Sequence, residues 1–230
     1  MKLLFVSLGC DKNLVDSEEM LGLLTGNGFE IVDDETEAEA IVVNTCCFIN
    51  DAKEESVNTI LEMAEYKKSG ICKVLIVTGC MAQRYQDEIQ QEIPEVDAVI
   101  GTTGYTEIVP ILDEILAEAE ASQKEAAVEE PKEKSFVNCC PSIDLLPASL
   151  ADKRVVTTGG YTAYLKIAEG CNKRCTYCII PYIRGHYRSF PMEDLLEEAR
   201  KLAEGGVKEL ILIAQETTVY GMDCYGRKAL

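Results

Sequence analysis

Three cysteines in one short loop carry the strongest chemical signal of this sequence. Cys171, Cys175 and Cys178 have the spacing C-x3-C-x2-C and directly follow an apolar run over residues 163–168. A structural zinc site uses four protein ligands, usually as two separated pairs, and an electron-transfer cubane is also held by four cysteines. Three thiolates in so tight a loop can hold three irons of a [4Fe-4S] cube and leave the fourth iron free to bind a small molecule. The spacing therefore predicts an iron–sulfur cluster with one open iron.

A second set of cysteines is scattered along the chain but is predicted to meet in space. Cys10, Cys46 and Cys80 each follow an apolar, strand-like run by a few residues. The carboxyl ends of parallel strands share one edge of an open sheet, and ligands bind at that edge. We therefore expect the three thiols to converge on a second cluster, again one ligand short. Buried cysteine is also a common core residue, so ordinary core packing stays open as the alternative.

The neighbours of these cysteines suggest two further expectations. Gly9 and Gly79 precede Cys10 and Cys80, and a residue without a Cβ lets the backbone approach a bulky inorganic core. A helix is expected after each cysteine, and the positive end of a helix favours the thiolate over the thiol. The remaining cysteines are expected not to bind a cluster, and they are Cys47, Cys72, Cys139, Cys140 and Cys224. For Cys47 the alternative is that it competes with Cys46 as a ligand.

Short apolar runs alternate with helical periods through the first half of the chain. Asp16 with Glu19, and Asp51 with Glu54, have the spacing of capping boxes at two helix starts. Strands alternating with helices predict a parallel sheet that is covered on both faces. We expect a flavodoxin-like open parallel α/β sheet, with strands over 3–6, 30–32, 40–43, 74–77 and 98–100.

Composition divides the chain into three parts. Residues 1–118 form the predicted N-terminal domain, and residues 119–158 are expected to be an acidic and irregular linker. A second unit over 159–230 contains a strand, the cysteine loop, a helix over 192–204 and a strand over 209–214. A strand–helix unit of a parallel fold takes about 30 residues, so only the first units of a barrel fit. We expect a truncated partial barrel and the front part of a longer protein.

Charge and cysteine content narrow the functional classes. The chain has 22 basic and 40 acidic residues, a net charge of −18, which would repel nucleic acid and attract a basic protein. Direct nucleic-acid binding is therefore not expected. Eleven cysteines without a recognisable export signal indicate the reducing cytoplasm, where thiols serve as metal ligands or reactive groups. The apolar runs are too short to predict a membrane span.

The motifs resemble those of the methylthiotransferases of the radical S-adenosylmethionine (SAM) superfamily, over residues 7–18, 43–46, 78–80 and 170–185. The resemblance implies a SAM-binding [4Fe-4S] cluster in the 171–178 loop and an auxiliary [4Fe-4S] cluster on the other three cysteines. It also implies that Tyr177 adjoins the adenine, with plain packing as the alternative, and that Gln215 and Glu216 lie near the SAM amino group. Arg184 and Arg188 are expected to pair either with the SAM carboxylate or with acidic linker side chains.

Within this family, residues 9–13 and 179–185 resemble the branch that modifies a ribosomal protein. The transfer-RNA branch has glutamine and methionine where this chain has Asp11 and Lys12. The resemblance implies that a methylthio group is added to the β-carbon of an aspartate in the twelfth small-subunit ribosomal protein, with flavodoxin or ferredoxin as electron donor. A tRNA adenosine methylthiotransferase, an electron-transfer module without catalysis and an inert truncated iron–sulfur fragment remain as alternatives.

Overall fold

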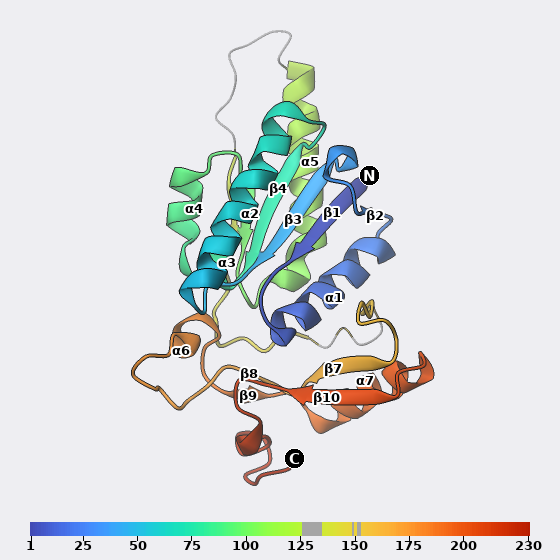
Figure 1. Ribbon diagram of the computed structural model, residues 1–230, viewed down its shortest axis with the longest axis vertical. Helices are drawn as coiled ribbons and strands as arrows, with labels where there is room; N and C mark the ends of the chain where they lie inside the picture. The colour runs from blue at the N-terminus through green and yellow to red at the C-terminus, as the bar shows by residue number, and fades with distance from the viewer. Residues whose placement is uncertain (126–134, 149, 151–152) are drawn as a thin grey trace.

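The computed structural model describes residues 1–125, 135–148, 150 and 153–230. Within these residues, six parallel strands form a sheet in the order β2-β1-β3-β4-β5-β6 (Figure 1). The parallel α/β sheet predicted from the sequence is thereby confirmed. Its strands are β1 (Lys2–Ser7), β2 (Glu30–Val32), β3 (Ala40–Thr45), β4 (Val74–Gly79), β5 (Ala98–Ile100) and β6 (Val137–Cys139).

Helices cover both faces of this sheet and create a core on each side. Alternate residues of β3 face opposite cores. Ile41 packs with Ile60 of the helix α2 (Asn50–Ser69), whereas Val42 packs with Leu24 of the helix α1 (Asp11–Gly26). Because both faces are buried, the central strands are apolar at successive positions, as expected for a parallel sheet. The covering helices are α1 (Asp11–Gly26), α2 (Asn50–Ser69), α3 (Cys80–Arg84), α4 (Gln86–Glu92) and α5 (Ile108–Glu125).

The expected irregular linker contributes regular structure to the first unit. Helix α5 continues to Glu125, and β6 pairs in parallel with the outer edge of β5, so that Val99 lies opposite Asn138. This strand was not predicted from the sequence because it has only three residues and lies in the segment expected to be an acidic, irregular linker. Pairing with β6 satisfies backbone groups that β5 would otherwise leave at an open edge.

Both predicted capping boxes are wrong. Helix α1 begins at Asp11 and α2 at Asn50, and neither has a side-chain cap among the described residues. Asp16 and Glu19 lie inside α1 and are buried. Asp16 instead pairs with Lys166 and Arg184 of the second unit, and Glu19 interacts with Tyr105 and Lys166.

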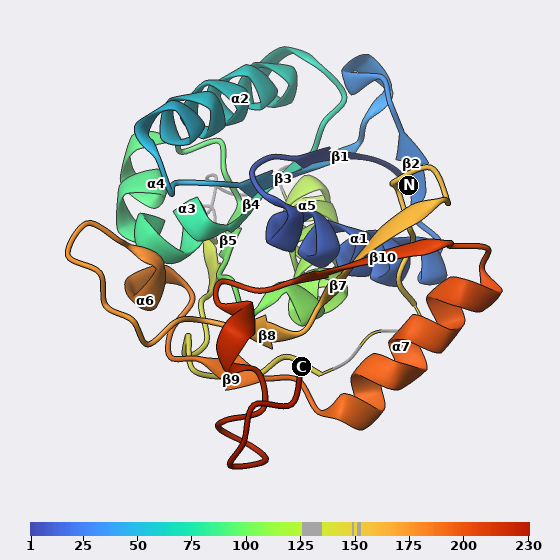
Figure 2. The same cartoon turned by 60° about the horizontal axis from the view of Figure 1, so that its bottom comes forward.

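The second unit lies against the carboxyl ends of β1, β3 and β4 (Figures 1 and 2). Strands β7 (Thr162–Lys166) and β10 (Glu209–Ile213) pair in parallel, and β8 (Ala168–Glu169) pairs with β9 (Arg188–Ser189) in antiparallel fashion. Helix α7 (Met192–Glu204) covers β7. The short helix α6 (Ile180–Ile183) contacts α3 of the first unit. Three 3-10 turns complete the described elements, namely η1 (Glu35–Glu37), η2 (Tyr105–Glu107) and η3 (Thr217–Val219).

No helix in the described part of the chain combines the length and the apolar character that a membrane span requires.

Candidate metal centres

The structure brings Cys10, Cys46 and Cys80 to one edge of the first sheet. Cys10 is the residue before α1, Cys46 directly follows β3, and Cys80 is the first residue of α3. Asn13 joins these chain segments: its Nδ2 donates to the carbonyl oxygen of Thr45 at 2.9 Å, and its Oδ1 accepts from the Cys80 Sγ at 3.7 Å. Three strand ends that are distant in sequence therefore present their thiols in one neighbourhood.

Burial differs among these three cysteines. Cys46 and Cys80 are buried, whereas Cys10 is exposed. Burial raises the pKa of Cys46, and it raises the pKa of Cys80 to about 12. The expectation that helix ends favour thiolates is therefore wrong for these two groups, because removal from water outweighs any benefit of a nearby helix end.

The glycines beside these cysteines lie against other parts of the protein. Gly79 has φ +90°, a left-handed conformation, and a Cβ there would lie 2.6 Å from the Thr45 carbonyl oxygen. Gly9 has φ +97°, and a Cβ there would lie 2.8 Å from the Cβ of Cys46. The protein's own backbone and side chains therefore require glycine at both positions.

The second candidate centre is the loop that follows β8. Cys171, Cys175 and Cys178 line a cavity of about 440 Å³ together with residues that include Pro181 and Tyr182. The loop is held by backbone hydrogen bonds from Cys171 to the Gly185 carbonyl, at 3.1 Å, and from Cys178 to the Cys175 carbonyl, at 2.9 Å. Cys175 is exposed and the other two thiols are half-buried.

Both candidate donor sets consist of cysteine thiols alone. Among the described residues, no three cysteine, histidine, aspartate or glutamate side chains lie close enough to ligate one ion. In a cubane each thiolate binds a different iron, so the sulfurs are spread more widely than around a single zinc. Purely thiolate donors also match the ligands of iron–sulfur clusters.

The predicted SAM-binding residues occupy three different settings. Tyr177 is 88% exposed. Gln215 donates to Glu169 at 3.4 Å, and its Oε1 is buried without a hydrogen-bond partner in the described part of the chain. Glu216 accepts from the Thr218 amide at 3.1 Å and pairs with Lys173 of the cysteine loop. The hydrogen bond from Lys173 lowers the pKa of Glu216 to about 2. Their roles toward SAM stay predictions.

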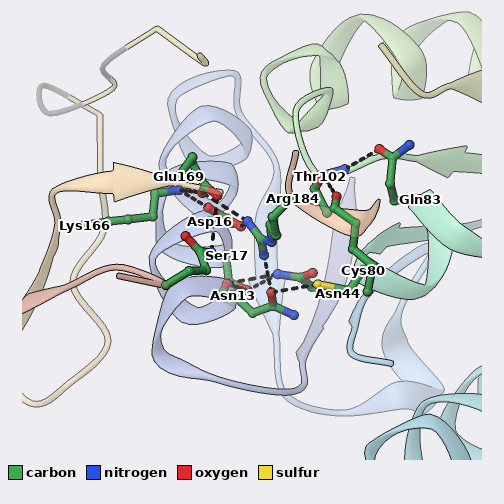
Figure 3. A network of polar contacts seen from close by, with 12 residues as sticks. Asn13, Asp16, Ser17, Asn44, Cys80, Gln83, Thr102, Lys166, Glu169 and Arg184 are labelled. Atoms are coloured by element: carbon green, nitrogen blue, oxygen red, sulfur yellow. Dashed lines mark hydrogen bonds and ion pairs between the residues drawn. The ribbon is translucent and has the colours of Figure 1, made fainter. Parts of the chain in front are cut away.

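A buried network of charged side chains, missed in the sequence, joins the two units (Figure 3). Arg184 donates to Asp16 at 2.8 Å and to Glu169 at 3.1 Å, and it also donates to the Oδ1 of Asn13. Lys166 pairs with the same two carboxylates. Two cations thus balance two carboxylates, which is the arrangement that buried charges require. A lysine within an apolar strand, and an aspartate within a helix, are the sequence signals of this network.

A second buried ion pair stabilises the contact between α1 and the second unit. Arg154 donates to Glu18 of α1 at 2.6 Å and to Glu198 of α7 at 2.5 Å. Glu18 also accepts from the Thr157 amide at 2.6 Å. Close by, a Cβ on Gly22 would overlap the carbonyl oxygen of Lys153, so the chain before β7 packs directly on α1.

The remaining polar candidates have structural partners. His186 Nδ1 lies 3.0 Å from Asp144, and Arg188 lies 3.5 Å from the same carboxylate. Arg188 thus pairs with an acidic residue of the expected linker, whereas Arg184 pairs with Asp16 and Glu169, which lie outside that linker. The Cys47 Sγ donates to the Cys80 carbonyl oxygen at 3.2 Å, and burial raises the pKa of Cys47 to about 11.

The other bystander cysteines are free thiols. Cys72 is buried in the core formed with α2. Cys139 and Cys140 are half-buried, and Cys224 is exposed.

Comparison with known proteins places the two units in known families. Residues 2–101 match the model of the uncharacterized protein family UPF0004, and residues 165–227 match that of the radical SAM superfamily. The chain is 62% identical over its whole length to the ribosomal protein uS12 methylthiotransferase RimO of Lachnoclostridium phytofermentans, covering 48% of that protein. It is 55% identical over 98% of its length to the protein of the same name from Acetivibrio thermocellus, covering 47% of it.

The alignments also show how much of each relative's length the chain covers. A relative of the same name from Clostridioides difficile is 49% identical over the whole chain, which covers 48% of that protein. The chain therefore spans about half the length of the curated relatives it matches. The UPF0004 match contains Cys10, Cys46 and Cys80, and the radical SAM match contains the cysteine loop. Over its whole length the chain is therefore similar to proteins named as uS12 methylthiotransferases, and it contains one segment of the UPF0004 type and one of the radical SAM type.

Proposed function

We propose that this chain is about half of an enzyme that adds a methylthio group to the β-carbon of an aspartate in ribosomal protein uS12. The observation that carries the proposal is the presence of two separate three-cysteine centres in one chain, one at a sheet edge and one in a loop. The names of the relatives support the substrate, since each is described as a uS12 methylthiotransferase.

The six cysteines are proposed to hold two [4Fe-4S] clusters. Cys171, Cys175 and Cys178 would hold the SAM-binding cluster, and the sheet-edge cysteines Cys10 and Cys46, with Cys80, the auxiliary cluster. When bound, these clusters supply the reductive cleavage of SAM and the sulfur that is transferred. With three thiols at each centre, the protein leaves one corner of each cube for a ligand that is not a side chain.

The chain's other residues are proposed to position SAM and to shield the reaction from water. Pro181 and Tyr182 line the cavity beside the cysteine loop, and the exposed ring of Tyr177 is proposed to lie against the adenine. Gln215, whose Oε1 is buried and unpartnered in the described part of the chain, is proposed to accept from the SAM amino group. Glu216 would contribute to the same region through its contact with Lys173 of the loop.

Charge and thiol chemistry support the proposed partners and location. A net charge of −18 favours a basic protein substrate over an RNA. All eleven cysteines are free thiols, as the reducing cytoplasm would keep them, and we propose that compartment. A flavodoxin or ferredoxin is proposed as the electron donor. We also propose that residues 1–118 and 159–230 are the two cluster-binding units, joined by residues 119–158.

The decisive experiment is anaerobic reconstitution of the chain with iron and sulfide. Two [4Fe-4S] clusters correspond to about eight irons per chain. Replacing the cysteines of either centre by alanine should remove half of the iron, whereas the matched control Cys72→Ala should keep all of it. Retention of full iron content after loss of Cys10, Cys46 and Cys80 would contradict the auxiliary site.

Activity is tested on a form of the chain extended to the length of its relatives. It should form 5′-deoxyadenosine from SAM under reducing conditions and increase the mass of uS12 by one methylthio group. Transfer RNA, offered in a parallel reaction, should stay unmodified. Modification of the tRNA with no change in uS12 would replace the proposed substrate, and absence of SAM cleavage would remove the enzyme proposal.

A further inference from the structure

Arg184 brings a buried positive charge from the second unit to the sheet-edge cysteines. Its side chain is 2% exposed, and it donates to the Oδ1 of Asn13, the atom that also accepts from the Cys80 Sγ. Burial alone would lower the pKa of Arg184, but Asp16 and Glu169 more than reverse this, and its pKa stays well above the usual value. The guanidinium therefore remains charged beside Cys80.

The backbone that carries Arg184 is fixed to the first unit as well. Helix α6 begins two residues after Cys178 of the loop centre and contacts α3, the helix that begins with Cys80. Ile183 is buried in the core of the first unit, and its carbonyl oxygen accepts from the Thr102 hydroxyl at 2.9 Å. One short segment thus connects the last cysteine of one centre to the surroundings of the other.

The carboxylates around Arg184 lie on one side of its guanidinium group, and the cysteine thiol lies on the other. Asp16 and Glu169 lie on the side of the guanidinium away from Cys80, next to Lys166, whereas Asn13 and Cys80 lie on the other side (Figure 3). Lys166 shares both carboxylates with Arg184. The carboxylates are therefore partly neutralised by a second cation, and of the charged groups in this network Arg184 is the one that acts on Cys80.

We propose that Arg184 is a positioning residue that couples the two cysteine centres and makes the auxiliary cluster easier to reduce. This rests on the proposed function, since it takes Cys10, Cys46 and Cys80 as ligands of that cluster. Reduction adds negative charge to a cluster, and a cation held nearby in a medium of low dielectric constant stabilises the reduced form. One side chain has both effects because its contact with Asn13 links the second unit to the sheet-edge cysteines and also holds its positive charge near them.

The test measures the reduction potential of the auxiliary cluster alone. A chain with Cys171, Cys175 and Cys178 changed to alanine is reconstituted anaerobically and titrated, with the electron paramagnetic resonance of the reduced cluster as the signal. Arg184→Gln should shift the midpoint potential to a lower value, because the cation is lost. Arg184→Lys keeps the charge and should restore much of that shift. Asp16→Asn removes a negative charge and should shift the potential upward.

The matched control is Arg154→Gln. Arg154 is equally buried and also pairs a carboxylate of α1 with the second unit, through Glu18 and Glu198. It serves the same kind of structural contact, but its partners do not include a cysteine, so its loss should leave the potential unchanged. An equal shift in both glutamine variants would show a general loosening of the contact and would overturn the proposal.

The outcomes separate this inference from the proposed function. A cluster that forms but keeps its potential in Arg184→Gln, or that shifts upward, overturns the role of Arg184 and leaves the auxiliary site intact. Should Arg184→Gln fail to fold, an unchanged potential in Asp16→Asn overturns it instead. Failure of the parent chain to assemble any cluster on Cys10, Cys46 and Cys80 removes the proposed function and this inference together.

Discussion

The sheet-edge centre draws its thiols from three strand ends spread over residues 10–80, whereas the loop centre takes all of its thiols from residues 171–178. Two of the sheet-edge thiols are buried under α-helices, while the loop thiols are half-buried or exposed around an open cavity. A set of three thiols is thus held once by a buried core and once by local backbone hydrogen bonds. The comparison indicates that the sheet-edge centre depends on the fold of the whole first unit, whereas the loop centre depends mainly on its own segment.

The largest expected contrast is in thiol reactivity of the cluster-free chain. A thiol with a pKa of about 12 has roughly one part in 10⁴ as thiolate at pH 8, and the thiolate is the reactive form. Cys80 is also buried, whereas Cys175 is exposed. We expect iodoacetamide to alkylate Cys175 about 10³-fold faster or more, measured by peptide mass spectrometry. Comparable rates would mean that the first centre is as accessible as the loop.

A methyl group added beside the sheet-edge centre should be far more costly than one added in the second unit. Gly79→Ala combines a left-handed φ with overlap against backbone, and we expect a loss of about 2–4 kcal/mol in the free energy of unfolding. The matched variant is Gly206→Ala, with φ +104° but no described neighbour within 4 Å of its Cβ. It should cost about 1 kcal/mol. Urea denaturation of both variants measures the difference.

Glu19 gives the boundary between the two units a dependence on pH. Burial raises its pKa to about 7 from an ordinary value of 4.5, and its Oε2 has no partner in the described part of the chain. The groups that face it are Lys166, Tyr105, Asp16 and Glu198. Because the folded carboxyl keeps its proton while the unfolded one has lost it, stability falls as pH rises from about 4.5 to 7.

Glu19→Gln removes this titration. We expect its gain in unfolding free energy over the parent chain to be larger at pH 8 than at pH 5 by about 1–3 kcal/mol, from the shift in pKa. Chemical denaturation at the two pH values measures this difference. A gain that is the same at both values would mean that the carboxyl is already charged at pH 5.

The smallest effect concerns a residue of the second unit that belongs to the core of the first. Ile183→Val removes one buried methylene and should destabilise the chain by about 1 kcal/mol. Ile211→Val, at a position that is 39% exposed on β10, should have almost no effect. Equal effects in thermal denaturation would contradict the view that α6 is part of the first core.

The sequence predicted a helix or strand correctly where the spacing of apolar residues within that one element was enough to identify it. Strand β5 and helix α7 lie where their apolar patterns place them, since each pattern reports the burial of one element. The cysteine spacing of the loop is equally local. Strand β6 could not be found this way because it has three residues and is selected by the open edge of β5.

Charged residues mark the limit of such predictions. Asp16 and Glu19 have the spacing of a capping box, yet both are buried inside α1 and face Lys166 and its neighbours. The identity of an acidic residue in the sequence does not reveal whether its side chain caps a helix or pairs with a distant cation. The partner of Asp16 lies 168 positions away in Arg184, so the choice depends on how the two units pack.

By itself, the amino-acid sequence determined the parallel α/β architecture, the three-thiol loop and the resemblance to methylthiotransferases. These features follow from periodicity and from spacing within short segments, which the chain carries without any tertiary contact. Only the tertiary structure decided that the Cys46 and Cys80 thiols are buried and that Arg184 reaches across to Asn13. Burial and charge pairing are properties of the packed interior, because desolvation and Coulomb energy depend on which groups meet and how far they lie from water.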